Sequence, residues 1–152
     1  MTFINKIQLL LALIIVSSFS LFAQMPSEIV SAQINISFVS SDIFFAEEAI
    51  KTVEIKAEEA DTYILVEEKL KLITENPKVL AISRDSIITL TVEFGILKNI
   101  QLLLERAKFP GKDAVKFKRL VSTIKKAEEY LIVEYEKQKN SAKTPQEENK
   151  KK

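Results

Sequence analysis

Two prolines divide the chain beyond residue 41 into three long segments. Pro77 follows Asn76, and Pro110 lies between Phe109 and Gly111. Proline disfavours helical geometry in the residue before it and suits the first turn of a new helix, so both positions mark helix boundaries. Within each segment, apolar residues recur every three or four positions, which is the spacing of one helix face. The sequence therefore predicts three helices, at residues 42–75, 77–108 and 112–140.

One stretch of the second segment supports a competing prediction. Residues 88–94 alternate apolar and polar side chains and are rich in β-branched residues, which is typical of a strand. We predict a helix here, because residues 96–107 continue with helical spacing and no neighbouring strand offers a hairpin partner. A strand at residues 86–94 stays the alternative.

The predicted fold class is all-α, an elongated antiparallel three-helix bundle. Short connections force neighbouring helices to run antiparallel, and helices of about 30 residues are roughly 45 Å long at about 1.5 Å per residue. The second helix is apolar nearly all round, which is typical of the middle of a bundle or of an oligomer interface. Residues 33–38 also alternate polar and apolar side chains, so they form either one short N-terminal strand or part of an extended leader.

The first 23 residues have the pattern of a cleavable export signal. Lys6 precedes an apolar run at residues 7–16, and Ala23 is the small residue expected before a cleavage site. The mature chain is then expected to begin at Gln24 and to act outside the cytoplasm, in the periplasm, at the cell surface or as a secreted protein. The remaining chain divides into an extended leader at residues 24–41, a helical domain at 42–139 and a disordered, Lys/Glu-rich tail at 140–152.

The chain contains neither histidine nor cysteine. Ser-His-Asp and Cys-His catalytic groups therefore cannot be assembled, and zinc sites lose their usual ligands. Glu54, Glu58 and Asp61 share one face of the predicted first helix, with Glu59 beside them, but no second acidic helix or glycine-rich loop accompanies them. We interpret these carboxylates as a solvated helix face, and we predict a protein that is not an enzyme and holds no cofactor or metal.

Charge is distributed unevenly along the chain, although the formal net charge is only +1. Residues 42–76 contain ten acidic residues and four lysines, whereas residues 105–126 contain eight basic residues and two acidic ones. One interpretation is that the two segments lie side by side and complement each other. The other is a basic patch around the turn at residues 109–111 that binds an anionic partner. This basic patch comprises Arg106, Lys108, Lys112, Lys116, Lys118 and Arg119.

The composition of the basic patch favours some partners over others. An anionic glycan, an anionic lipid or an acidic protein would suit exposed lysines and arginines. Nucleic acid is not expected, because the patch lacks the interleaved aromatic residues on which single-strand binders stack bases. We also expect homo-oligomer formation through the apolar helix at residues 77–108.

Together these features predict an exported, non-enzymatic helical interaction protein that binds an unknown partner at the periplasm or cell surface. The alternative is a periplasmic chaperone or assembly factor, in which the apolar second helix drives oligomerisation. The order of an export signal, a strand and long charged helices is similar to that of periplasmic holdase chaperones of the Skp type, although no closing pair of strands is evident.

Overall fold

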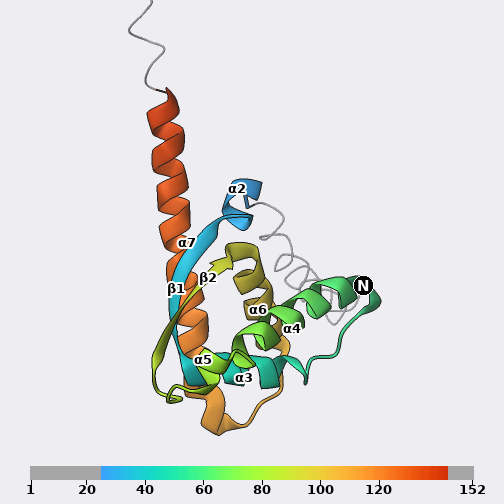
Figure 1. Cartoon of the computed structure of the whole chain (residues 1–152). Coiled ribbons are helices and arrows are strands. Elements are labelled where there is room, and N and C mark those ends of the chain that lie inside the picture. The colour runs from blue at the N-terminus through green and yellow to red at the C-terminus, as the bar shows by residue number, and fades with distance from the viewer. Residues whose placement is uncertain (1–24, 144–152) are drawn as a thin grey trace, which may run out of the picture.

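Residues 25–143 fold into a mixed arrangement of helices and strands, so the predicted all-α, elongated three-helix bundle is wrong. These residues are described by a computed structural model (Figure 1), and the predicted export signal and the tail beyond residue 143 lie outside them. The elements in chain order are α2 (Ser27–Val30), β1 (Gln33–Val39), α3 (Ser40–Ile50), the 3-10 helix η2 (Ala57–Glu59), α4 (Ala60–Thr74), α5 (Pro77–Leu80), β2 (Ile87–Glu93), α6 (Phe94–Arg106), the 3-10 helix η3 (Gly111–Asp113) and α7 (Ala114–Lys143).

β1 and β2 form a two-stranded antiparallel sheet with one apolar and one polar face. On the polar face, the Ser37 and Thr89 hydroxyls are 2.8 Å apart, and the Thr91 hydroxyl donates to the Asn35 side chain at 2.6 Å. The apolar face packs on the helices through three cross-strand pairs, as expected for a sheet with one buried side. These pairs are Phe38 with Ile88, Ile36 with Leu90, and Ile34 with Val92.

The predicted helix at residues 88–94 is wrong, and the strand alternative is what the protein adopts. The alternating pattern prevails because β1 pairs with this segment and buries one of its faces. The partner residues are far apart in the sequence: Ser37 and Thr89 are separated by 52 positions. β1 is therefore not a hairpin neighbour of residues 88–94 in the sequence.

The predicted continuous helix at residues 42–75 is also wrong, because α3 ends at Ile50 and α4 begins at Ala60. The hydroxyl of Thr52 donates to the Ala49 carbonyl at 2.7 Å, and the Thr52 backbone N–H donates to the same carbonyl at 3.1 Å. Such local side-chain bonds compete with the helical ladder. Residues 51–56 consequently leave the helix and cross to α4 as a loop.

The third predicted helix is confirmed as α7, which runs from Ala114 to Lys143. α3 is the central helix of the fold, because it contacts α4, α6, α7 and β1. α6 lies beside it and buries most of its apolar residues in the core of the single chain, among them Phe94, Leu97, Ile100 and Leu104. None of the helices among the described residues is long and apolar enough to cross a membrane.

Ser40, the first residue of α3, provides a test of this packing. Its side chain is fully buried, and its hydroxyl oxygen has no hydrogen-bond partner within the described residues. An unsatisfied buried hydroxyl destabilises the folded state. We expect Ser40→Ala to leave the free energy of unfolding unchanged or to raise it by about 1 kcal/mol, measured by urea titration.

Thr52→Val is the matched control for Ser40→Ala. The Thr52 hydroxyl donates to Ala49 and also accepts the backbone N–H of Lys108 at 2.8 Å. Its removal should therefore lower the free energy of unfolding by about 1–2 kcal/mol. A Ser40→Ala loss as large as that of Thr52→Val would mean that the Ser40 hydroxyl has a partner after all.

Candidate functional site

The six residues of the predicted basic patch lie in three different surroundings. Arg106 and Lys108 line a cleft against the 51–56 loop. Arg119 is bound to α3. At the start of α7, Lys116 forms an ion pair with Asp113 at 2.8 Å, while Lys112 and Lys118 make no ion pair within the described part of the chain. The structure thus brings two of the six residues, Arg106 and Lys108, into one cleft.

Arg119 joins α7 to α3 through a two-pronged ion pair. Its Nε and Nη2 atoms donate to the two carboxylate oxygens of Asp42 at 2.6 Å and 2.5 Å. The Asp42 side chain is only 1% exposed, whereas that of Arg119 is 45% exposed. The hydrogen bonds to Asp42 raise the pKa of Arg119 above its ordinary value. Arg119 is therefore a structural residue, because it neutralises a buried carboxylate.

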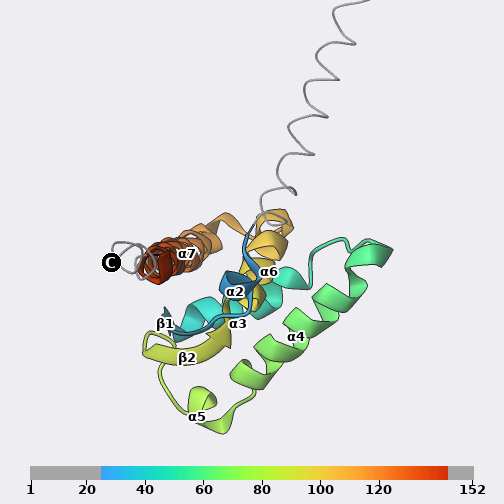
Figure 2. The ribbon, with the colours of Figure 1, turned by 90° about the horizontal axis from the view of Figure 1, so that it is seen from above.

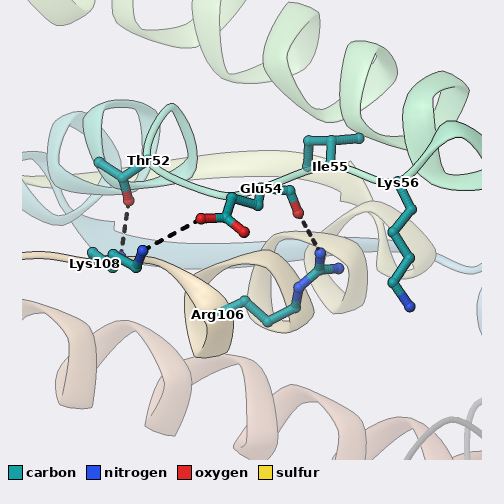
Figure 3. A pocket seen from close by; sticks show the side chains of 6 residues that line it. All are labelled: Thr52, Glu54, Ile55, Lys56, Arg106 and Lys108. Atoms are coloured by element: carbon teal, nitrogen blue, oxygen red, sulfur yellow. Dashed lines mark hydrogen bonds and ion pairs between the residues drawn. The ribbon is translucent and has the colours of Figure 1, made fainter.

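The cleft lies where the end of α6 meets the 51–56 loop, and its volume is about 420 Å³ (Figure 3). Figure 3 shows Glu54 between the two basic residues of the patch, with its carboxylate toward Lys108 and its carbonyl toward Arg106. The lining carries three cations and one carboxylate. Its residues are Thr52, Glu54, Ile55, Lys56, Arg106 and Lys108.

Arg106 is the fixed cation of the cleft. Its Nη1 and Nη2 atoms donate to the Glu59 carboxylate at 2.7 Å and 3.0 Å, and Nη2 also donates to the Glu54 carbonyl at 2.6 Å. These bonds hold the 51–56 loop and η2 against α6. The Arg106 hydrogen bonds, followed by one from the Lys56 backbone N–H, lower the pKa of Glu59 below its ordinary value.

This lowered pKa gives the ion pair a defined pH dependence. The stabilisation from the charged Glu59 is fully present above its ordinary pKa of 4.5 and is lost as the pH falls through the lower pKa of the folded state. We expect Arg106→Gln to reduce the free energy of unfolding at neutral pH by about 1 kcal/mol. Urea titrations at a series of pH values should show this difference shrinking below pH 4.5. A difference that stays constant into strong acid would contradict the role of the Glu59 charge.

The other two cations of the cleft, Lys108 and Lys56, have weak contacts with the carboxylates of the protein or none. The Lys108 ammonium lies 3.5 Å from the Glu54 carboxylate, but the two side chains are 80% and 93% exposed, so this pair contributes little. The Lys56 ammonium makes no ion pair or hydrogen bond within the described residues. Sequence reasoning missed Lys56 and Thr52, because both were assigned to a continuous helix. The β-branched Thr52, Val53 and Ile55 were the available signal of a break.

The cleft has the chemistry of an anion-binding site. Arg106 is oriented by its own partners, while Lys56 and Lys108 carry ammonium groups on flexible stems, a type of group that can bind phosphate, sulfate or carboxylate as a point charge. Glu54, Glu58, Glu59 and Asp61 do not gather into a metal site. Among residues 25–143, no group of three or more potential metal ligands lies close together.

Comparison of the chain with protein-family models, curated proteins and solved structures finds no match.

Proposed function

We propose that the protein is an exported, non-enzymatic interaction protein that binds an anionic group of its partner in the cleft. The observation that carries the proposal is the lining: three cations line the cleft, Arg106 and Lys108 are paired with Glu59 and Glu54, and the Lys56 ammonium makes no ion pair within the described residues. Sulfate, phosphate and carboxylate groups share the chemistry that this lining recognises. Such groups occur on anionic glycans and on lipid headgroups, so either kind of molecule could supply the anionic group.

Export is part of the same proposal and rests on the sequence of residues 1–23, with Gln24 as the first residue of the mature chain. An extracytoplasmic location would make glycans and lipid headgroups accessible. The chaperone or assembly-factor alternative depended on an apolar second helix at an oligomer interface. α6, which is the helical part of residues 86–108, instead buries Phe94, Leu97, Ile100 and Leu104 within one chain, so this helix gives that alternative no support.

The proposal predicts retention of the protein on a sulfated glycan column or on vesicles that contain an anionic lipid. Binding should weaken as salt rises, because exposed charges are screened over about 8 Å at physiological ionic strength. The double variant Lys56→Glu with Lys108→Glu should lose this retention and keep its helical circular dichroism, since neither ammonium group supports the core. Retention on only one of the two matrices would identify the source of the anionic group.

A matched control carries the same change in charge on other residues of the chain. Lys112→Glu with Lys116→Glu alters the basic patch at the start of α7 and leaves the cleft intact. We expect this control to be retained like the wild type. Loss of retention in the control but not in the cleft variant would contradict the cleft as the binding site. No retention of the wild type on either matrix, even at low salt, would overturn the proposed function.

A further inference from the structure

The outer face of α4 alternates acidic residues with leucines. Steps of four and three residues place five exposed side chains on one stripe of this helix and its C-cap. Leu65 and Leu72 are 42% and 67% exposed, which is unusual for large apolar side chains. None of the acids on this stripe forms an ion pair within the described residues. The stripe comprises Asp61, Leu65, Glu68, Leu72 and Glu75.

α7 carries a surface of complementary chemistry. A shallow groove of about 390 Å³ runs along this helix. The half-buried side chains of Phe117 and Val121 supply apolar surface in it, and three exposed lysines line it without an ion pair in the described part of the chain. The full lining is Phe117, Lys118, Val121, Ser122, Lys125, Lys126 and Glu129.

The acidic stripe and the basic groove cannot satisfy each other within one molecule. α3 and α6 each contact both α4 and α7, and Figure 2 shows α4 and α7 on opposite flanks of these two helices. The intramolecular pairs between the acidic and basic segments instead use Asp42, Glu54 and Glu59, which lie on α3, in the 51–56 loop and in η2. The acids of the α4 stripe and the lysines of the α7 groove thus have no ion-pair partner within the described residues.

We propose that the α4 stripe of one molecule docks in the α7 groove of a second copy. The spacings match: Glu68 and Glu75 are seven residues apart, as are Lys118 and Lys125, and seven residues span about 10.5 Å of helix. Two ion pairs can therefore form at once. Leu72 lies between the two acids and would cover the apolar surface of the groove, which removes exposed apolar area from water.

This contact joins two different surfaces, so it is heterologous. Each molecule offers one stripe and one groove on opposite flanks, and successive copies therefore add head to tail to form a chain or a ring. The contact does not depend on the cleft, because Lys56, Arg106 and Lys108 belong to neither surface. Failure of the anion-binding proposal and failure of this one are therefore distinguishable.

Sedimentation velocity of the purified protein tests the contact. At low salt, the weight-average sedimentation coefficient should rise with protein concentration. The rise should diminish at about 0.5 M salt, where screening acts over only about 4 Å. Two variants should each lower the association constant about tenfold or more: Glu68→Lys with Glu75→Lys on α4, and Lys118→Glu with Lys125→Glu on α7.

Mixing the two variants is the sharper test. The α4 variant retains a basic groove and the α7 variant retains an acidic stripe, so the mixture should associate although neither variant does so alone. Lys78→Glu with Lys139→Glu makes the same change in charge as the α7 variant at exposed sites outside both surfaces, and it should associate like the wild type. A wild type that stays monomeric at every concentration in low salt would overturn the proposal. A mixture of the two variants that fails to associate would overturn it as well.

Discussion

Phe38→Ala is expected to lower the free energy of unfolding by about 3–5 kcal/mol, the usual loss for truncating a buried phenylalanine. Phe38 lies in β1, is 3% exposed, and pairs with Ile88 on the apolar face of the sheet. In the predicted three-helix bundle the same residue belongs to an extended leader, where truncation changes little. Urea unfolding followed by circular dichroism measures the effect.

Ile87→Ala provides the control on the other strand of the same sheet. Ile87 pairs with Val39 but is 72% exposed, so its truncation should lower the free energy of unfolding by less than about 1 kcal/mol. A Phe38→Ala loss no larger than that of Ile87→Ala would show that β1 does not belong to the core.

Arg119→Met is expected to lower the free energy of unfolding by about 2–3 kcal/mol. The variant keeps the apolar stem of the side chain but leaves the buried Asp42 carboxylate without its cation. Breaking one side of a buried ion pair costs about 3–5 kcal/mol, and the partial exposure of Arg119 reduces this. The measurement is again urea unfolding at neutral pH.

Lys118→Met controls for the loss of one positive charge from α7. Lys118 is exposed and makes no ion pair within the described residues, so this change should stay within about 0.5 kcal/mol of the wild type. Adding Asp42→Asn to Arg119→Met should recover part of the lost stability, because the neutral amide needs no cation. If the double variant is as unstable as the two single losses added together, the two side chains act independently.

The local patterns of the sequence predicted individual elements better than their assembly. The 3.6-residue period located α7 and most of α6, since no other element competes for those segments. The alternation at residues 33–38 and at 88–94 was visible in both cases. The sequence could not reveal that these two segments pair. Their pairing is stabilised by the joint burial of Ile36, Phe38 and Ile88, which depends on the three-dimensional fold. Without that pairing, residues 88–94 read as part of a helix.

The sequence predicted some residues of the candidate site but not how they come together. Arg106 and Lys108 stood out because the 105–126 segment is rich in basic residues. Lys56 did not, since its segment is acidic overall, and the apolar spacing of the predicted helix continues across the break at residues 51–56. Lys56 reaches the same cleft as Arg106 because residues 51–56 form a loop in place of the predicted helix.

The pairing of β1 with β2 has a consequence for how the chain reaches its folded state. β1 is made early, but its only strand partner among the described residues begins at Ile87, and α3, α4 and α5 lie between them. The sheet therefore closes a long loop. The contacts between the strands can offset the entropy lost in closing it only after the intervening segment has been synthesised. Non-local pairings of this kind slow folding relative to a bundle of sequential helices. Until β2 is available, β1 has no strand partner among the described residues, so it stays unpaired while the intervening helices are synthesised.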